Sequence, residues 1–125
     1  MIVYFLLGLF LTLTIVRLAA HLLHDIDGYG TQYEKSKTLT GYLRKKTGFD
    51  LHHIHFGFIL LIILIVIYLL YEINELYVSL LAVSLSLIFD QILPWLKLGD
   101  YFSQKMLSFS IIFHMLIAIT ALYIF

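Results

Sequence analysis

The chain has 125 residues, of which 62% are hydrophobic and 13% charged, with 8 basic side chains, 8 acidic side chains and no cysteine. A soluble globular protein averages about half apolar and a quarter charged residues, so this composition excludes a soluble domain and predicts a protein of the lipid bilayer. The absence of cysteine excludes disulfide scaffolds, iron–sulfur clusters, cysteine-based zinc sites and thiol catalysis. The balanced charge argues against a nucleic-acid partner.

Four apolar stretches are long enough to cross a bilayer core as helices, which takes about 20 residues each. These expected spans cover about 2–24, 51–71, 76–96 and 102–125. The apolar runs are continuous, whereas a transmembrane strand alternates between apolar and polar residues, and lipid cannot satisfy open backbone groups. The sequence therefore predicts an all-α membrane protein, a single domain of four transmembrane helices packed as an antiparallel bundle.

Basic residues are concentrated in the two loops that join the first span to the second and the third span to the fourth. The long loop, 25–50, contains most of them, and Lys97 lies in the short loop 97–101. The turn 72–75 contains Glu72 and Glu75 and no basic residue. By the positive-inside rule, both termini are expected outside the cell and the loop 25–50 in the cytoplasm.

The long loop also contains a short amphipathic pattern. Leu39, Tyr42 and Leu43 fall at positions i, i+3 and i+4, with most of the basic residues elsewhere on the helical wheel, which predicts an interfacial helix over 36–46. Four basic residues of this segment are expected to bind anionic lipid head groups: Lys37, Arg44, Lys45 and Lys46. The alternative is that they only set the topology. Membrane lipids are thus the expected partners, and a homo-oligomer or a larger membrane complex stays open.

Imidazoles and carboxylates gather in the cytoplasmic half of the spans. In chain order they are His21, His24, Asp25, His52, His55, Asp90 and His114. The spacings 21/24 and 52/55 place each pair on one face of its helix, and helical bundles build metal sites from side chains on facing helices. Nitrogen and carboxylate ligands suit a transition metal such as zinc or iron. We expect one metal, or a close pair, bound by His21, His24, His52, His55 and possibly His114, with Asp25 or Asp90 completing the coordination or acting as the catalytic carboxylate.

The sequence also predicts roles for two residues near this group. Arg17 is expected to be a buried partner of Asp25 or Asp90, or a charge that snorkels to the interface, rather than a catalytic group. Pro94 has no N–H to donate to the carbonyl of Asp90, and such a freed carbonyl often accompanies a polar site in a membrane helix.

Helical spacing pairs two serines with polar neighbours on their own helix and gives expectations for one more histidine and a tyrosine. Ser86 is one turn from Asp90, and Ser110 is one turn from His114, so each serine is expected to orient that neighbour through a hydrogen bond. His53 is expected to face a different neighbour or the interface, because it lies about 100° from His52 around the helix. Tyr101 is expected to be one of several interfacial aromatic anchors.

The segments His-x-x-His-Asp at 21–25 and His-His-x-His at 52–55 resemble the histidine boxes of membrane fatty-acid desaturases and hydroxylases. The resemblance implies oxygen activation by iron beside a lipid chain. The alternative enzyme is a zinc hydrolase, in which a metal-bound water attacks an ester or phosphoester of a lipid head group, with Asp25 or Asp90 as the base.

Three non-catalytic functions also fit the sequence. One is a b-type haem electron carrier, with axial imidazoles from two helices such as His55 and His114. Another is a subunit of a larger membrane complex. The third is a purely structural network of polar side chains.

Overall fold

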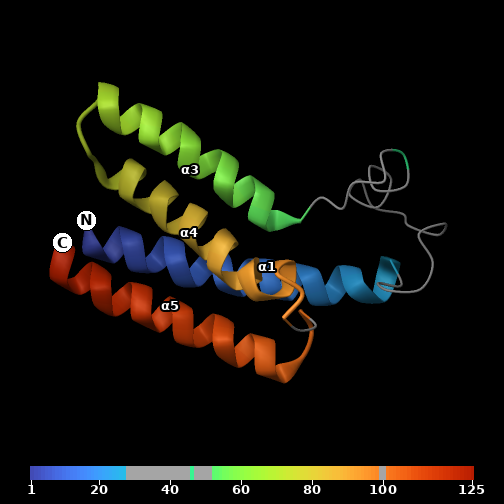
Figure 1. Cartoon of the computed structure of the whole chain (residues 1–125). Coiled ribbons are helices and arrows are strands. Elements are labelled where there is room, and N and C mark those ends of the chain that lie inside the picture. Colours follow the sequence, from blue (N-terminus) through green and yellow to red (C-terminus); the bar gives the residue numbers. More distant parts are fainter. Residues whose placement is uncertain (28–45, 47–51, 99–100) are drawn as a thin grey trace.

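A computed structural model describes residues 1–27, 46, 52–98 and 101–125. The described chain is helical, with four helices that are each long and apolar enough to cross a membrane. They are α1 (Ile2–Asp27), α3 (His53–Leu70), α4 (Glu75–Trp95) and α5 (Gln104–Ile124) (Figure 1). The four expected spans are therefore confirmed, with ends that differ by at most three residues from those expected.

Local hydrogen bonds explain where α4 and α5 begin and where α4 ends. The side chain of Asn74 accepts a hydrogen bond from the backbone N–H of Tyr77, and Ser103 accepts one from Met106, which satisfies backbone groups that the first turn leaves open. At the end of α4, Lys97 adopts a φ of 60°, and the N–H of Leu98 donates to the carbonyl of Leu93. This left-handed turn at Lys97 follows the last helical residue, Trp95, which is one residue after Pro94.

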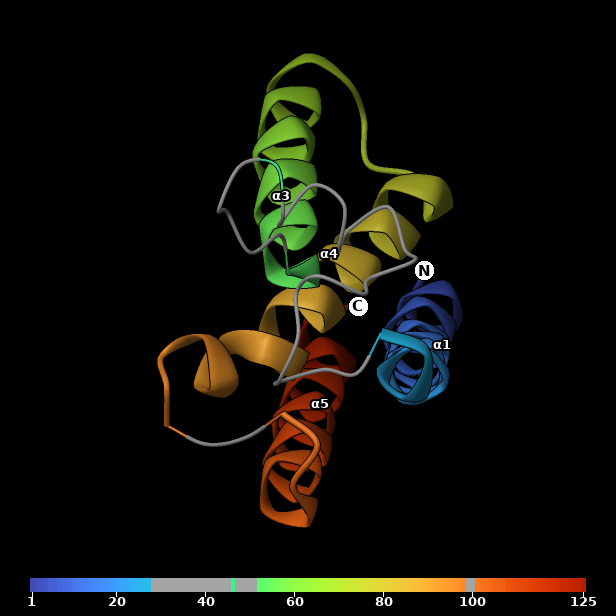
Figure 2. The same ribbon diagram turned by 90° about the vertical axis from the view of Figure 1, so that its right-hand side faces the viewer.

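Helix α4 is the central element of the fold. It packs most extensively against α1 and α3, and α5 packs against α4 and α1. Figure 2 shows α3 and α5 on opposite sides of α4. Because α4 has neighbours on several sides, it buries residues all along its length: Val78, Ala82, Ser84, Ser86, Ile88, Asp90 and Gln91.

Two glycines allow the closest approaches to α4. A Cβ atom on Gly8 of α1 would lie 2.8 Å from the carbonyl oxygen of Ser79, and one on Gly57 of α3 would lie 2.8 Å from the Cγ1 atom of Ile88. The hydroxyl of Ser84 donates to the carbonyl of Gly57 over 2.9 Å. Small residues let membrane helices approach in this way, so these two positions set the distances of α1 and α3 from α4.

The two ends of the structure differ in chemistry. An apolar core fills the end that contains both chain termini (Figure 1). Its buried members are Phe5, Leu9, Val78, Ala82, Ala118 and Ala121. The buried charged groups lie toward the other end, where α1 and α4 end and where α3 and α5 begin. The described part of the chain therefore has its buried polar groups toward one end of the helices and an apolar core toward the other.

The interfacial helix expected over 36–46 lies outside the described residues, except for Lys46, which is exposed. Three of the expected head-group ligands, Lys37, Arg44 and Lys45, also lie outside them.

Candidate functional site

The buried carboxylate of Asp90 joins groups from all four helices and from the linker between α4 and α5. Asp90 is 2% exposed. Its Oδ1 atom accepts hydrogen bonds from Arg17 Nε and Ser110 Oγ, both at 2.6 Å. Its Oδ2 atom accepts from the hydroxyl of Tyr101 at 2.6 Å and from His53 Nε2 at 3.2 Å. A carboxylate offers about four lone-pair positions, so this one is saturated. Asp90 could act as a catalytic base only if one of these donors left.

Arg17 supplies the positive charge that compensates Asp90. Besides the ion pair, its Nη1 atom donates to the carbonyl of Tyr101 at 2.8 Å, and its Nη2 atom lies 3.4 Å from the carbonyl oxygen of Asp90. That carbonyl has no helical donor because Pro94 lacks an N–H. The expected pairing of Arg17 with Asp90 is confirmed, and the same guanidinium also reaches the carbonyl that Pro94 leaves open.

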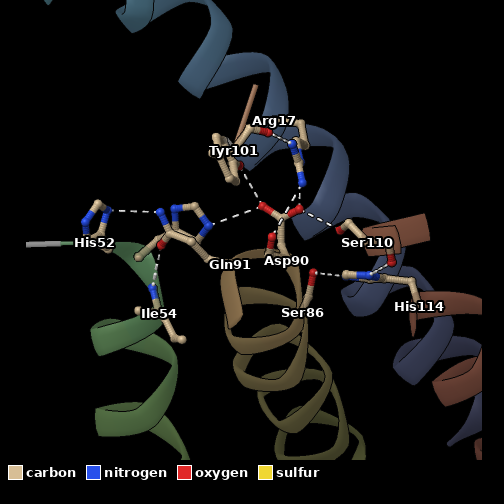
Figure 3. Close-up of polar contacts among 10 residues, drawn as sticks. Arg17, His52, Ile54, Ser86, Asp90, Gln91, Tyr101, Ser110 and His114 are labelled. Carbon is tan, nitrogen blue, oxygen red and sulfur yellow. Dashed lines mark hydrogen bonds and ion pairs between the residues drawn. The ribbon is translucent and has the colours of Figure 1, made fainter. Parts of the chain in front are cut away.

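Tyr101 contacts three members of the site rather than lying alone at the interface. Besides its hydroxyl contact with Asp90, its ring lies 4.0 Å from the guanidinium carbon of Arg17 and packs edge-on against the ring of His53, with a centroid distance of 5.5 Å. The linker residue Tyr101 therefore covers the ion pair, as Figure 3 shows. Helical spacing could not predict this position, because Tyr101 lies in the linker before α5.

His114 is fully buried one turn deeper than Ser110, and both of its nitrogens have partners. Its Nδ1 atom lies 2.7 Å from the carbonyl oxygen of Ser110, and its Nε2 atom lies 2.8 Å from Ser86 Oγ. The hydroxyl of Ser110 instead bonds to Asp90. Ser86 and Ser110 thus direct their hydroxyls to partners on the opposite helix (Figure 3), not to the same-helix partners that spacing suggested.

Gln91 connects α4 to the first turn of α3. Its Oε1 atom accepts a hydrogen bond from the backbone N–H of Ile54 at 3.2 Å, and its Nε2 atom lies 3.0 Å from His52 Nδ1. The first N–H groups of a helix have no partner within the helix, so Gln91 satisfies one of them from a neighbouring helix. Sequence reasoning missed this residue, although a glutamine beside Asp90 in an apolar helix was a usable signal.

The other histidines lie around the same end of the molecule. The rings of His52 and His55 stack at a centroid distance of 6.2 Å, and the Nδ1 atom of His55 lies close to both the N–H and the carbonyl of His52. The ring of His21 is exposed and packs against Phe102 at 5.6 Å. The side chains of His24 and Asp25 lie outside the described part of the chain.

Within residues 1–22, 46, 52–98 and 101–125, no group of three or more histidine, aspartate or glutamate side chains is arranged to bind a metal ion. The predicted ligand His114 is bonded within the core, and His53 rather than His52 contacts Asp90. The described part of the predicted metal site therefore consists of separate imidazoles at one end of the helices.

Comparison of the chain with models of known protein families, with curated proteins and with solved structures gave no match. The class that the described residues define is a helical protein with four candidate membrane spans and a buried ion pair near one end.

Proposed function

We propose that this chain is a small integral membrane protein with a metal-dependent catalytic site at the end of the helices where α3 and α5 begin. The observation that carries the proposal is the ion pair of Arg17 and Asp90, which is buried among helices long enough to span a membrane and is contacted by His53. Ionisable groups inside a span are costly, and proteins retain them mostly for function. The one-sided position of this network favours an enzyme over a transport path, because an apolar core closes the other end.

The metal in this proposal is zinc or iron. His21, His24, His52, His55 and Asp25 are the predicted ligands from the last turns of α1 and the first turn of α3. His21 packs against Phe102, and His53 packs against the adjacent Tyr101, which supports a common site between these two helix ends. Three such ligands would leave a position on zinc for a water molecule, and more of them would suit an iron site that activates oxygen.

The proposed substrate is a lipid or another hydrophobic molecule that reaches the site from the bilayer. In this proposal the site lies near the ends of the spans, close to the depth where head groups begin. In this proposal Lys37, Arg44, Lys45 and Lys46 hold an anionic head group by charge.

Elemental analysis of protein purified in mild detergent without chelator tests the metal. We expect about one equivalent of zinc or iron per folded chain and a loss of at least half of it in His21→Ala, because one ligand fewer weakens coordination. Lys105→Ala, a change at an exposed residue of α5, is the control and should keep the metal. A folded wild-type protein with neither metal would favour the structural network. A Soret absorption band would favour the haem carrier instead.

The proposed arrangement is an antiparallel bundle with both termini outside and 25–50 in the cytoplasm. Because the chain has no cysteine, single cysteines can be labelled without background. With an impermeant reagent added to intact cells, we expect Glu72→Cys to be labelled and Ser36→Cys to be labelled only after permeabilisation, since basic loops remain inside. The reverse pattern would invert the orientation.

A further inference from the structure

We propose that the ion pair of Arg17 and Asp90 is a binding site for a membrane-soluble phenol, and that the side chain of Tyr101 occupies this site until such a ligand displaces it. This phenol site is separate from the proposed metal and does not depend on it. Tyr101 makes the contacts that a bound phenol would make, and it makes them from a linker rather than from a helix.

The phenol group of Tyr101 contacts side chains from three helices. Its hydroxyl donates to Asp90 Oδ2 over 2.6 Å, and its ring lies 4.0 Å from the guanidinium carbon of Arg17. Its ring also meets the ring of His53 edge-on, at a centroid distance of 5.5 Å. Hydrogen bonds to a charged acceptor are stronger than those between neutral groups, and a guanidinium over an aromatic face is attracted to it. Together these contacts recognise an aromatic ring that carries a hydroxyl.

The two oxygens of Asp90 have different kinds of support. Oδ1 accepts from Arg17 and Ser110, and both of these contacts are buried between helices. Oδ2 accepts from Tyr101 and His53, and both of these contacts are only partly buried. If the hydroxyl of Tyr101 leaves, the carboxylate keeps its counter-ion and gains one open acceptor position on Oδ2. Asp90 can therefore exchange one hydroxyl donor for another without losing the compensation of its charge.

Tyr101 can leave Asp90 without the movement of a helix. It lies between the end of α4 at Trp95 and the start of α5 at Gln104, and it is half-buried. Rotation of its side chain about the Cα–Cβ bond breaks the contact of the hydroxyl with Asp90. The backbone carbonyl of Tyr101 can keep its hydrogen bond from Arg17 Nη1 during this rotation. The space over the ion pair is then open, while the helices that build the site stay in place (Figure 3).

The chemistry of the vacated position selects a hydroxyl-bearing ring over an ordinary lipid chain. An acyl chain over Asp90 would leave one acceptor position of a buried carboxylate without a donor, and such an unsatisfied group is costly. A phenol restores that hydrogen bond and places its ring over the guanidinium of Arg17. The helices around the site are long enough to span a membrane, so the ligand is expected to carry an alkyl chain that keeps it in the bilayer. The side chain of tyrosine is itself a phenol with an alkyl group at the para position, which makes 4-nonylphenol a suitable probe.

The first experiment compares 4-nonylphenol with its methyl ether, 4-nonylanisole, which has the same ring and chain but no hydroxyl hydrogen. Binding to the wild-type protein in mild detergent is measured by titration calorimetry, with protein-free micelles as the blank. We expect the phenol to bind at least about fivefold more tightly than the ether, because only the phenol can donate to Asp90. Equal binding of the two compounds would refute the phenol site, whatever the outcome of the metal analysis.

The second experiment tests whether Tyr101 competes with the ligand. In Tyr101→Phe the ring stays but the hydroxyl that holds it to Asp90 is lost, so a larger fraction of the chains is open to the ligand. Apparent affinity rises with that fraction, and we expect 4-nonylphenol to bind at least about threefold more tightly than to wild type. Tyr123→Phe, the same substitution at a side chain that is 88% exposed, is the matched control and should not change the affinity. If Tyr101→Phe, folded by circular dichroism, binds the phenol no more tightly than wild type, Tyr101 does not occupy the ligand site and the proposal is wrong.

Discussion

Replacing Arg17 with methionine is expected to lower the free energy of unfolding by about 3–5 kcal/mol, because it leaves the carboxylate of Asp90 buried without its counter-ion. Methionine keeps most of the length and apolar volume of the arginine stem, so the change removes mainly charge and hydrogen bonds. It also removes the contacts to the carbonyls of Tyr101 and Asp90. Unfolding of the detergent-solubilised protein, followed by circular dichroism, measures the effect.

The double variant Arg17→Met with Asp90→Asn distinguishes an unpaired charge from simple loss of packing. Removing both charges should recover more than half of the loss, since a neutral pair in a membrane helix costs far less than one uncompensated ion. Lys105→Met is the matched control: this cation is exposed on α5, so its loss should change stability by less than about 0.5 kcal/mol. A double variant as unstable as Arg17→Met alone would refute the ion-pair explanation.

The helices could be located from the sequence for a simple physical reason. A run of about 20 apolar residues is required by the thickness of the bilayer, so the four spans follow from length and composition. The pairing of Arg17 with Asp90 could also be anticipated, because each is a charge inside a span and each needs a compensating partner.

The partners across helices could not be predicted in the same way. In a soluble helix the apolar face shows which side is buried, but a membrane helix is apolar toward lipid and toward protein alike. The sequence therefore does not show how each helix is rotated about its own axis. For the same reason it does not show whether His52 or His53 lies beside Asp90. Ser86 bonds to His114 and Ser110 bonds to Asp90, each on the other helix. Spacing along one helix could not predict these bonds, because it gives no information about the adjacent helix.

Small residues carry part of the information that hydrophobicity lacks. Gly57 lies one turn after His53 and marks the face of α3 that meets α4, because its backbone approaches Ser84 and Ile88. His53 and Gly57 are four residues apart and therefore on the same face. A glycine one turn from a histidine is thus a usable signal for the inward-facing imidazole, and His52 lacks one at that spacing.

Substituting leucine for Gly57 is expected to push α3 away from α4 and to cost about 1–3 kcal/mol of stability. Even the first added carbon would lie 2.8 Å from Ile88 Cγ1 and 3.0 Å from both Leu87 Cβ and the carbonyl oxygen of Ser84. Two of these atoms belong to the backbone or to Cβ and cannot turn aside. The same displacement should lengthen the contact between His53 and Asp90, which depends on the distance between the two helices.

Two further variants, one at an exposed position and one with a smaller side chain, serve as controls for this prediction. Ile62→Phe adds bulk on the same helix at a side chain that is 62% exposed, so it should leave the free energy of unfolding within about 0.5 kcal/mol of wild type. Gly57→Ala should fall between wild type and Gly57→Leu. Equal stability of Gly57→Leu and Ile62→Phe would mean that α3 does not pack this closely on α4. In that case the geometry that brings His53 to Asp90 would be wrong as well, because both contacts depend on the same approach of the two helices.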